Sequence, residues 1–493
     1  MTTPMRAVDA AFLAMERPSE PSHVGTLMIF GPSDAGPLTI DHVRSALVER
    51  LSMMPTARRV IDGDLGGLRR PWWRTVDRVD LDVHVRSLRL PADREPRGAL
   101  HDAVAAAHAQ RLDRRRPLWQ ILVIEGLGDD EVAVYAKVHL AAMDDSTGVD
   151  LMTALLDTER GPDPTMEHVT PRVEEVEPPS MAERVVGPVP DQIRRGLGFP
   201  VRLAGRAANA VGEQLPGLRE TAAETARRTP GVGRLAGLLP PTEPGPGAIE
   251  HPTGRAPRLS FNEPIGPTRS YAASTLPTGD LIRLKELTGR SFHAVTLTVC
   301  AGAVRRWLTI KQELPSSPIT AIVPVLVQGD RVGDANVSGL MVQLPTNVDD
   351  PMRRLELTAE AVARALDRDL GQSASLRQDI AMFAPPAVTG LAGRAMDLLP
   401  HRRYVSPTIN LAITNVPGPR REVHLAGRPL RAAHPVLSLS ETTPLSLGVQ
   451  AGPGVVGLGA IADGERVPDL LALVDAARHE LDELLFAAGD VID

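Results

Sequence analysis

The chain has 493 residues, which is too long for one ordinary hydrophobic core, so two domains are expected. It is 43% hydrophobic and 23% charged, as globular proteins are, and its single cysteine, Cys300, excludes a disulfide framework or a cysteine-rich metal site. The net charge of -7 argues against nucleic acid as the main partner. Because no signal-like run opens the chain and no stretch approaches the roughly 20 apolar residues of a membrane span, we expect a cytoplasmic protein, soluble or peripherally attached.

The first segments alternate between helix and strand. Residues 9–16 carry apolar side chains at helical spacing, and residues 23–30 (HVGTLMIF) form a compact apolar strand. Residues 38–52 have one apolar face at helical spacing and predict an amphipathic helix. Residues 79–86 predict a strand that ends in the letters HVR.

An arginine-rich string, RLDRRRPLW at residues 111–119, precedes a predicted strand over residues 121–125. Arginines beside a buried tryptophan are typical of a helix end docked on the core. Arginine also suits phosphate recognition, so a binding role stays open.

Residues 131–156 (EVAVYAKVHLAAMDDSTGVDLMTALL) predict a strand, a polar turn and a helix. Apolar residues alternate from Val132 to Val138, which predicts a strand with one apolar face that Leu140 continues. Thr147 and Asp150 are spaced as a capping box before the helix. His139, at the strand end beside acidic residues, suits general-base chemistry because imidazole titrates near neutrality; a satisfied or surface histidine is the alternative.

Residues 161–255 differ in composition from the segments on either side. They are rich in Pro, Gly, Arg and Glu and show no strand pattern. Within them, residues 191–211 place apolar residues among arginines, which predicts a basic amphipathic helix that either touches anionic lipid or forms a solvated inter-domain crossover.

The second half again reads as α/β. Helices are expected at residues 280–287, 291–308, 350–370 and 467–485, and strands at residues 270–276, 319–326, 445–450 and 457–462. Residues 409–419 predict a strand that enters a rigid Asn-Val-Pro-Gly-Pro turn. The thirteen histidines show no metal-ligand spacing, so no metal site is expected.

Several strings together resemble one known family. Lys-x-His-x-Ala-x-x-Asp at residues 137–144 resembles the HHxxxDG active-site segment of the bacterial wax ester synthase/diacylglycerol acyltransferase family, part of the CoA-dependent acyltransferase superfamily. Other family-like strings are HVG at 23–25, HVR at 84–86, LDRxRPLW at 112–119 and NVPGP at 415–419. The resemblance runs from Asp9 to about residue 485.

The resemblance implies an α/β fold of two chloramphenicol-acetyltransferase-like domains with mixed sheets and an inter-domain tunnel. The implied domains are residues 1–160 and residues 256–493, and residues 161–255 would be a Pro/Arg-rich crossover linker with amphipathic helices. In such a fold the arginine-rich string is a candidate for binding a CoA phosphate.

The active-site segment departs from the family at the residue that matters most. In the family the second His is the general base and the Asp orients the loop. Here the first His is His139 and the Asp is Asp144, whereas the second His is replaced by Leu140 and the Gly by Asp145. The resemblance therefore implies His139 and Asp144 as catalytic residues, with His293, which replaces part of an Asn-Asp pair, as a substitute base.

The resemblance also implies a set of residues that line the tunnel and meet the substrates. They are Leu140, Asp145, Asn336, Thr414, Asn415, Pro417 and Gly418. No metal or cofactor is implied, because acyl-CoA enters as a substrate.

The implied function is transfer of a long-chain acyl group from acyl-CoA to diacylglycerol or a fatty alcohol. A catalytically retired relative that binds acyl-CoA or lipid is one alternative, and an acyltransferase with a more nucleophilic acceptor, an amine or a thiol, is another. If the protein is a working O-acyltransferase, His139 acts as the base from a position displaced by one residue, and this displacement needs a bulge in its strand. The resemblance leaves open attachment to the inner membrane or to lipid droplets, and assembly as a homo-oligomer or with an active paralogue.

Overall fold

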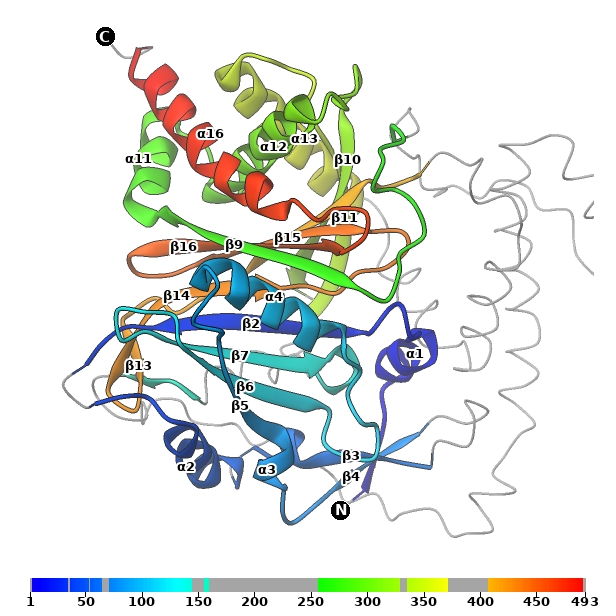
Figure 1. Ribbon diagram of the computed structural model, residues 1–493. Helices are drawn as coiled ribbons and strands as arrows, with labels where there is room; N and C mark the ends of the chain where they lie inside the picture. Colours follow the sequence, from blue (N-terminus) through cyan, green and yellow to red (C-terminus); the bar gives the residue numbers. More distant parts are fainter. Residues whose placement is uncertain are drawn as a thin grey trace, which may run out of the picture.

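The computed structural model describes residues 2–33, 36–52, 54–63, 71–143, 155–158, 256–328, 335–370 and 407–490. Two α/β domains stack on one another, with the C-terminal helices forming the outer layer of the upper domain (Figure 1). Within the described part of the chain, no helix is both long and apolar enough to cross a membrane. The predicted crossover at residues 161–255 lies outside the described residues, as does most of the helix predicted after the polar turn.

The N-terminal domain is built on a seven-stranded sheet of order β5-β6-β7-β2-β14-β13-β8. Its strands are β2 (His23–Phe30), β5 (Val85–Arg89), β6 (Trp119–Glu125), β7 (Val132–His139), β8 (Asp157–Thr158), β13 (Val423–Leu425) and β14 (Arg428–Val436). The sheet is mixed, because β5 pairs with β6 in parallel and the other pairs are antiparallel. Two of its strands, β13 and β14, thus come from the C-terminal part of the chain.

Helices and a small sheet surround this core. The helices are α1 (Ala7–Met15), α2 (Ile40–Leu51), α3 (Leu81–His84) and α4 (Pro96–Ala109). The small sheet has the order β1-β4-β3, with β1 (Thr2–Pro4), β3 (Arg59–Asp62) and β4 (Trp72–Thr75), and the 3-10 turn η1 (Thr56–Arg58) precedes β3.

The C-terminal domain has a six-stranded mixed sheet of order β11-β10-β12-β15-β16-β9. Its strands are β9 (Arg269–Pro277), β10 (Ile319–Gln328), β11 (Ala335–Leu344), β12 (Leu411–Val416), β15 (Leu445–Ala451) and β16 (Val455–Asp463). A layer of helices covers one face: α11 (Thr278–Thr288), α12 (Phe292–Ile310), α13 (Pro351–Leu370) and α16 (Leu470–Asp490) (Figure 1).

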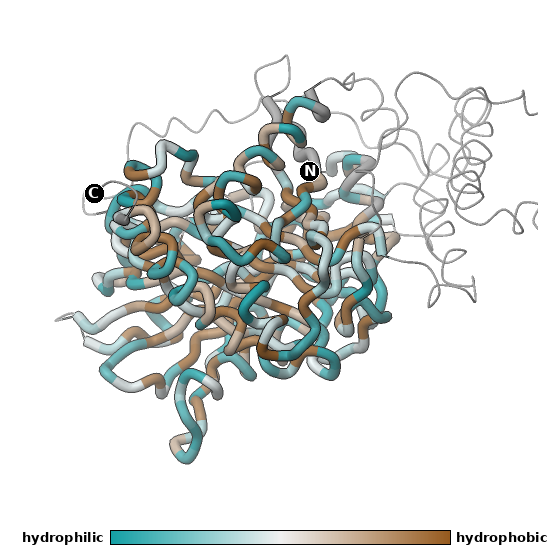
Figure 2. The backbone as a smooth tube through the Cα atoms, turned by 90° about the horizontal axis from the view of Figure 1, so that it is seen from above, coloured by the Kyte–Doolittle hydropathy of each residue, from teal (hydrophilic) through white to brown (hydrophobic). Residues whose placement is uncertain are grey.

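The apolar segments run through the interior of both domains, and polar segments gather at the periphery (Figure 2). One core lies between the six-stranded sheet and its helices, and a second lies beneath the seven-stranded sheet on the side of α2. A third core joins the domains, because it contains Leu27 and Tyr135 from the first sheet and Tyr271 and Ile461 from the second. The two domains therefore share apolar packing.

Strand β7 is buried along its whole length, on both faces, where the alternating pattern predicted only one apolar face. Two of the polar side chains on its second face, Tyr135 and Lys137, contact α4. Lys137 donates from Nζ to the carbonyl oxygens of Ala107 and Gln110, each at 2.6 Å, and thereby satisfies the C-terminal end of α4. His108 Nδ1 lies 2.6 Å from the Tyr135 hydroxyl.

The strand predicted over residues 79–86 is wrong at its start. Residues Leu81–His84 form the short helix α3, and strand β5 begins only at Val85. The Asp80 carboxylate accepts a hydrogen bond from the amide of Asp82, 3.2 Å away, and so stabilises a helical turn where the apolar alternation favoured a strand.

Glycines let strand β14 lie directly on the C-terminal sheet. A Cβ atom on Gly457 would overlap the carbonyl oxygen of Ala433, and one on Gly459 would overlap the carbonyl oxygen of Pro435. Both obstacles are backbone atoms of β14, which cannot move aside as a flexible side chain would. The two glycines are therefore needed for the contact between the domains.

We expect Gly459→Ala to destabilise the protein by about 1–3 kcal/mol, as overpacking a buried contact does. Gly454→Ala, in the turn between β15 and β16, is the matched control because nothing lies within 4 Å of its Cβ position. Urea unfolding measures both variants. Equal midpoints for the two would show that the close contact between β14 and β16 is unimportant for stability.

Candidate active site

The active-site segment begins where β7 ends. His139 is the last residue of the strand, and Leu140–Ala142 form the 3-10 turn η2. The amide of Leu140 donates to the carbonyl of Ser22, 2.8 Å away, and Arg6 Nη2 donates to the carbonyl of Met143 at 2.9 Å. The predicted base position, Leu140, thus lies in a helical turn anchored from two sides and does not continue the strand.

His139 caps this turn with its side chain. Its Nδ1 atom accepts a hydrogen bond from the amide of Ala141 at 3.0 Å, so one orphan donor of the turn is satisfied. The pairing of β2 with β7 is regular from His23 opposite His139 to Phe30 opposite Val132. The bulge that a displaced base would need is therefore not present between these strands.

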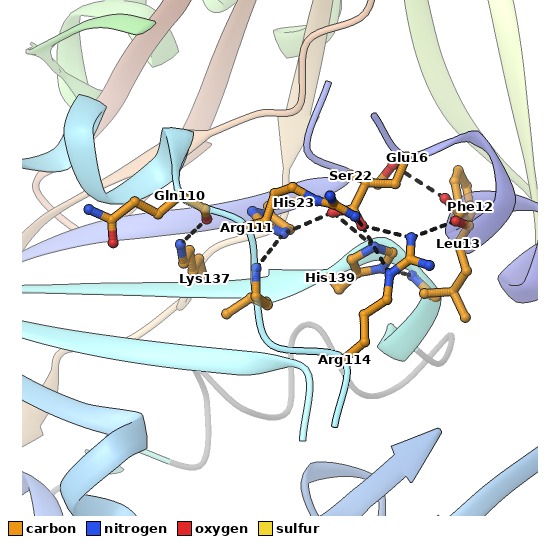
Figure 3. Close-up of polar contacts among 12 residues, drawn as sticks. Phe12, Leu13, Glu16, Ser22, His23, Gln110, Arg111, Arg114, Lys137 and His139 are labelled. Atoms are coloured by element: carbon orange, nitrogen blue, oxygen red, sulfur yellow. Dashed lines mark hydrogen bonds and ion pairs between the residues drawn. The ribbon is translucent and has the colours of Figure 1, made fainter. Parts of the chain in front are cut away.

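The Glu16 carboxylate faces two imidazole rings, those of His23 and His139 (Figure 3). Its Oε1 atom is 3.5 Å from Nε2 of His23 and 3.6 Å from Nε2 of His139, and all three side chains are at most 1% exposed. The two rings are neighbours across the sheet, with centroids 5.6 Å apart. A carboxylate from the end of α1 is thus enclosed beside the last residue of β7.

Two arginines neutralise this buried carboxylate. Arg111 and Arg114 contact Oε2 of Glu16 at 2.9 and 2.8 Å, and Arg114 also donates to the carbonyl of Leu13 at 2.6 Å (Figure 3). Burial by itself would raise the pKa of Glu16, but the neighbouring His139, His23 and Arg111 side chains outweigh it and hold that pKa far below its usual range. Glu16 is therefore ionised, and Arg111 and Arg114 hold its carboxylate in place.

The protonation of the His139 ring follows from its contacts. Because Nδ1 accepts the Ala141 amide proton, the ring carries its own proton on Nε2, which faces Glu16. Neither nitrogen then has a free lone pair for the proton of a substrate hydroxyl. No observation tests a catalytic role for His139, which stays a prediction.

Three other buried histidines link stability to pH. Burial lowers the pKa of His23, His101 and His434 to about 4 in each case. The unfolded chain binds protons at these sites below about pH 6.5, whereas the folded protein does not until about pH 4. Unfolding takes up protons between these values, so acid favours the unfolded state.

We expect the free energy of unfolding to fall as the pH is lowered from about 6.5 to about 4. His101→Gln should flatten this dependence, since the amide oxygen can replace Nε2 as the acceptor for the Ala273 amide, 3.2 Å away, but does not titrate. Urea midpoints measured across this range check the expectation. A wild-type midpoint that stays constant, or rises, on acidification would contradict it.

In the C-terminal domain the structure joins two of the predicted residues. Nδ2 of Asn415, near the end of β12, donates to Nδ1 of His293, near the start of α12, at 2.5 Å. Burial lowers the pKa of His293. Asn415 shares a strand face with Leu411 and Ile413, which pack under the helices, so His293 lies on the helix-covered face while Thr414 points to the opposite one.

The other predicted tunnel residues of this domain lie at the same end of the sheet, where strands β10 and β12 finish. Asn336 pairs with Val327 at the C-terminal end of β10, which runs parallel to β12. The carbonyl of Pro417 accepts from Gln450 Nε2 at 3.1 Å, and a Cβ on Gly418 would overlap the carbonyl oxygen of Ala451. Asp144 and Asp145 lie outside the described residues.

Two cavities bear on the predicted site and tunnel. One of about 150 Å³ touches the active-site turn at Ala141, Ala142 and Met143. The other, about 760 Å³, lies between the domains, and Leu27 and Ile29 on its wall are four and six residues along β2 from His23, or about 13–20 Å. A continuous tunnel between the domains stays a prediction. Across the described ranges, no group of three or more metal-ligating side chains is placed to hold an ion.

Comparison of the sequence with known proteins shows which family the chain belongs to. The sequence model of the wax ester synthase/diacylglycerol acyltransferase catalytic domain matches residues 5–295, and the C-terminal domain of the same family matches residues 335–485. The chain belongs to this family.

Relatives in the family cover nearly the whole chain. A putative diacylglycerol O-acyltransferase of Mycobacterium tuberculosis is 32% identical over 98% of this chain and 91% of its own length. A probable diacylglycerol O-acyltransferase of the same organism is 28% identical, with 98% of each chain covered. The resemblance inferred from the sequence strings is therefore confirmed.

Solved structures agree on the fold. The wax ester synthase/diacylglycerol acyltransferase of Marinobacter aquaeolei VT8 aligns over 99% of this chain and 100% of its own, with a TM-score of 0.65 and 24% identity. The first condensation domain of the calcium-dependent antibiotic synthetase aligns over 98% and 97%, with a TM-score of 0.50 and 16% identity. The predicted α/β fold of two chloramphenicol-acetyltransferase-like domains with mixed sheets is confirmed.

The sequence strings contained Glu16, His23 and Arg114, but sequence reasoning did not connect them. A signal was present: a glutamate at the end of the predicted helix over residues 9–16 and an arginine of the arginine-rich string are candidates to pair when both are buried. Which glutamate meets which arginine depends on the packing of α1 against the segment before β6, and sequence spacing does not determine that packing.

Proposed function

We propose that this protein is an O-acyltransferase that moves a long-chain acyl group from acyl-CoA to the hydroxyl of diacylglycerol or a fatty alcohol. The acceptor oxygen bonds to the thioester carbonyl carbon, the carbon–sulfur bond breaks, and the departing CoA sulfur receives the proton that the hydroxyl loses. The observation that carries the proposal is the active-site turn, which lies at the end of β7 in a chain that belongs to the acyltransferase family over almost its whole length.

With Leu140 at the base position, the reaction depends on placing the two substrates. Orienting two reactants supplies a large part of many enzymatic rate enhancements, whereas a general base typically contributes about 10²- to 10⁴-fold. The expected result is therefore slow transfer. No cofactor takes part in this proposal, because acyl-CoA itself is the activated substrate.

One observation favours a second candidate, a relative that binds acyl-CoA or lipid without turnover. The base position is apolar, and in the neighbouring His139 Nδ1 accepts from the Ala141 amide while Nε2 faces the Glu16 carboxylate at 3.6 Å. An acceptor that is already a good nucleophile, such as an amine or a thiol, would also need no strong base.

The test is transfer from radiolabelled palmitoyl-CoA by the purified protein, with dioleoylglycerol, hexadecanol, hexadecylamine and a long-chain thiol as separate acceptors. Labelled triacylglycerol or wax ester supports the proposal. Labelled amide or thioester alone changes the acceptor class. No product with any acceptor, together with saturable palmitoyl-CoA binding, would establish the binding protein in place of the enzyme.

We further propose that the protein acts in the cytoplasm and meets its acceptors at a lipid surface. Phe486 on α16 and Ile310 at the end of α12 are 74% and 68% exposed, which suits contact with an apolar surface. Flotation with lipid droplets or anionic vesicles, against Phe486→Asp, tests this attachment. Light scattering of the purified protein tests the proposed homo-oligomer, and co-purification tests pairing with an active paralogue.

A further inference from the structure

One imidazole caps the active-site turn. His139 is the strand end, and its Nδ1 caps the turn at Ala141. For Nδ1 to accept this hydrogen bond, the ring proton must reside on Nε2. An interaction at Nε2 that favours N–H there therefore also favours the cap.

Glu16 provides that interaction. Its Oε1 atom faces Nε2 of His139 at 3.6 Å in a site sealed from water, where the attraction between a carboxylate and an N–H is weakly screened. Oε1 makes no hydrogen bond within the described part of the chain, while Oε2 is occupied by Arg111 and Arg114. The arginines thus hold the carboxylate in place and leave one oxygen for the two imidazoles.

The same carboxylate oxygen also faces His23, the residue paired with His139 across the sheet. His23 is the first residue of β2 and directly follows Ser22. The carbonyl of Ser22 accepts a hydrogen bond from the amide of Leu140. Both chain segments that hold the turn, the end of β7 and the start of β2, therefore meet at Glu16. The turn is built around this buried charge.

We propose that Glu16 is a positioning residue for acyl transfer, which acts through His139: the anchored carboxylate holds the His139 ring so that Nδ1 caps the active-site turn. His139 then orients the turn and does not take the substrate proton. The inference rests on the proposed function for its effect on catalysis, whereas its effect on the turn is measurable without turnover.

The decisive variants are His139→Asn and His139→Ala in the full chain. An asparagine side-chain oxygen replaces Nδ1 as the cap for Ala141, but asparagine is not a base near neutral pH. We expect His139→Asn to keep the hydrogen-exchange protection of residues 140–143 and to retain more transfer activity than His139→Ala. His139→Ala should lower the protection of the Ala141 amide about two- to thirty-fold, as loss of a cap does, and reduce transfer with it.

Glu16→Gln tests the second step, since it keeps the shape of the side chain and removes the charge. We expect a loss of Ala141 protection in this variant, although Glu16 does not touch that amide. In Glu16→Gln combined with His139→Asn, we expect the same Ala141 protection as in His139→Asn alone, because an asparagine cap does not depend on a ring proton. Asp113→Asn is the matched control, because Asp113 pairs with Arg115 at an exposed position of the same arginine-rich string.

Two results would overturn the proposal. If His139→Asn keeps the protection of the turn but abolishes transfer, His139 is the base and not a positioning residue. If Glu16→Gln leaves the Ala141 amide as protected as in the wild type, Glu16 does not act on the turn. A wild type that transfers nothing, yet shows the expected exchange pattern, would reject the proposed function and leave the positioning role supported.

Discussion

Leu140→His is expected to raise the rate of acyl transfer by about 10²- to 10⁴-fold, the usual contribution of a positioned general base. Leu140 is half-buried in the active-site turn, at the residue that the resemblance of the sequence strings aligns with the family's second histidine. The backbone there is already held by Ser22, and leucine and histidine are similar in size, so the turn can accept an imidazole.

The control for this prediction is Leu140→Asn, which adds polarity at the same place without a group that titrates near neutrality. Steady-state rates with palmitoyl-CoA and dioleoylglycerol are measured for both variants, and across pH for Leu140→His, whose activity should rise as the new imidazole loses its proton. Equal rates for Leu140→His, Leu140→Asn and wild type would mean that the turn does not present residue 140 to the substrates.

The gain should also depend on the buried charge below the turn. In the Glu16→Gln background, Leu140→His is expected to give a smaller increase, because the new base is placed by the same η2 turn that His139 caps. An increase of the same size in both backgrounds would show that Glu16 and residue 140 act independently.

The largest loss of stability is expected from Arg354→Met. Arg354 donates from Nη2 and Nε to Oε1 of Glu480 at 2.6 and 3.1 Å, and both side chains are 2% exposed. Burial raises the pKa of Glu480, and Arg354 opposes that shift. Removing the arginine leaves a buried carboxylate without its charge partner, which typically costs about 3–5 kcal/mol.

The Arg354–Glu480 pair joins α13 to α16 across α12, where a Cβ on Gly302 would overlap the Glu480 carboxylate. Arg364→Met is the matched control, since Arg364 and Glu360 form an exposed pair at 3.2 Å that should contribute less than about 1 kcal/mol. Urea unfolding measures both variants. Similar losses for the two variants would contradict the role of burial.

Replacing both partners, in Arg354→Met with Glu480→Leu, should recover most of the loss, because a buried ion pair is often no more stabilising than apolar side chains of the same volume. A double variant as unstable as Arg354→Met would show that the arginine acts mainly through its other bonds, to the carbonyls of Val348 and Asp349.

Strongly periodic segments were predicted well from the sequence. The strand expected over residues 23–30 is β2 with those bounds, and the helices expected at residues 280–287 and 291–308 are α11 and α12. These segments bury one regular face against a large core, so local pattern and tertiary packing agree.

Strand β14 was not predicted, and its sequence explains why. It contains Pro429, Pro435 and three arginine or histidine residues, so it lacks a clear alternation of apolar and polar positions. Its structure depends on pairing with β2, about four hundred residues earlier in the chain, and on two glycines of β16 that let it approach. Such long-range partners leave no local signal.

By itself, the sequence determined the family, the two-domain α/β fold and the absence of an imidazole at residue 140, since a leucine cannot accept a proton in any fold. Only the tertiary structure decided that Glu16, His23, Arg114 and His139, from four separate segments, meet around one buried carboxylate beside the active-site turn. Sequence spacing sets which residues share one face of an element, but not which faces meet. It is the meeting of α1, β2 and β7 that turns the His139 ring toward Glu16 and leaves Nδ1 to hold the turn.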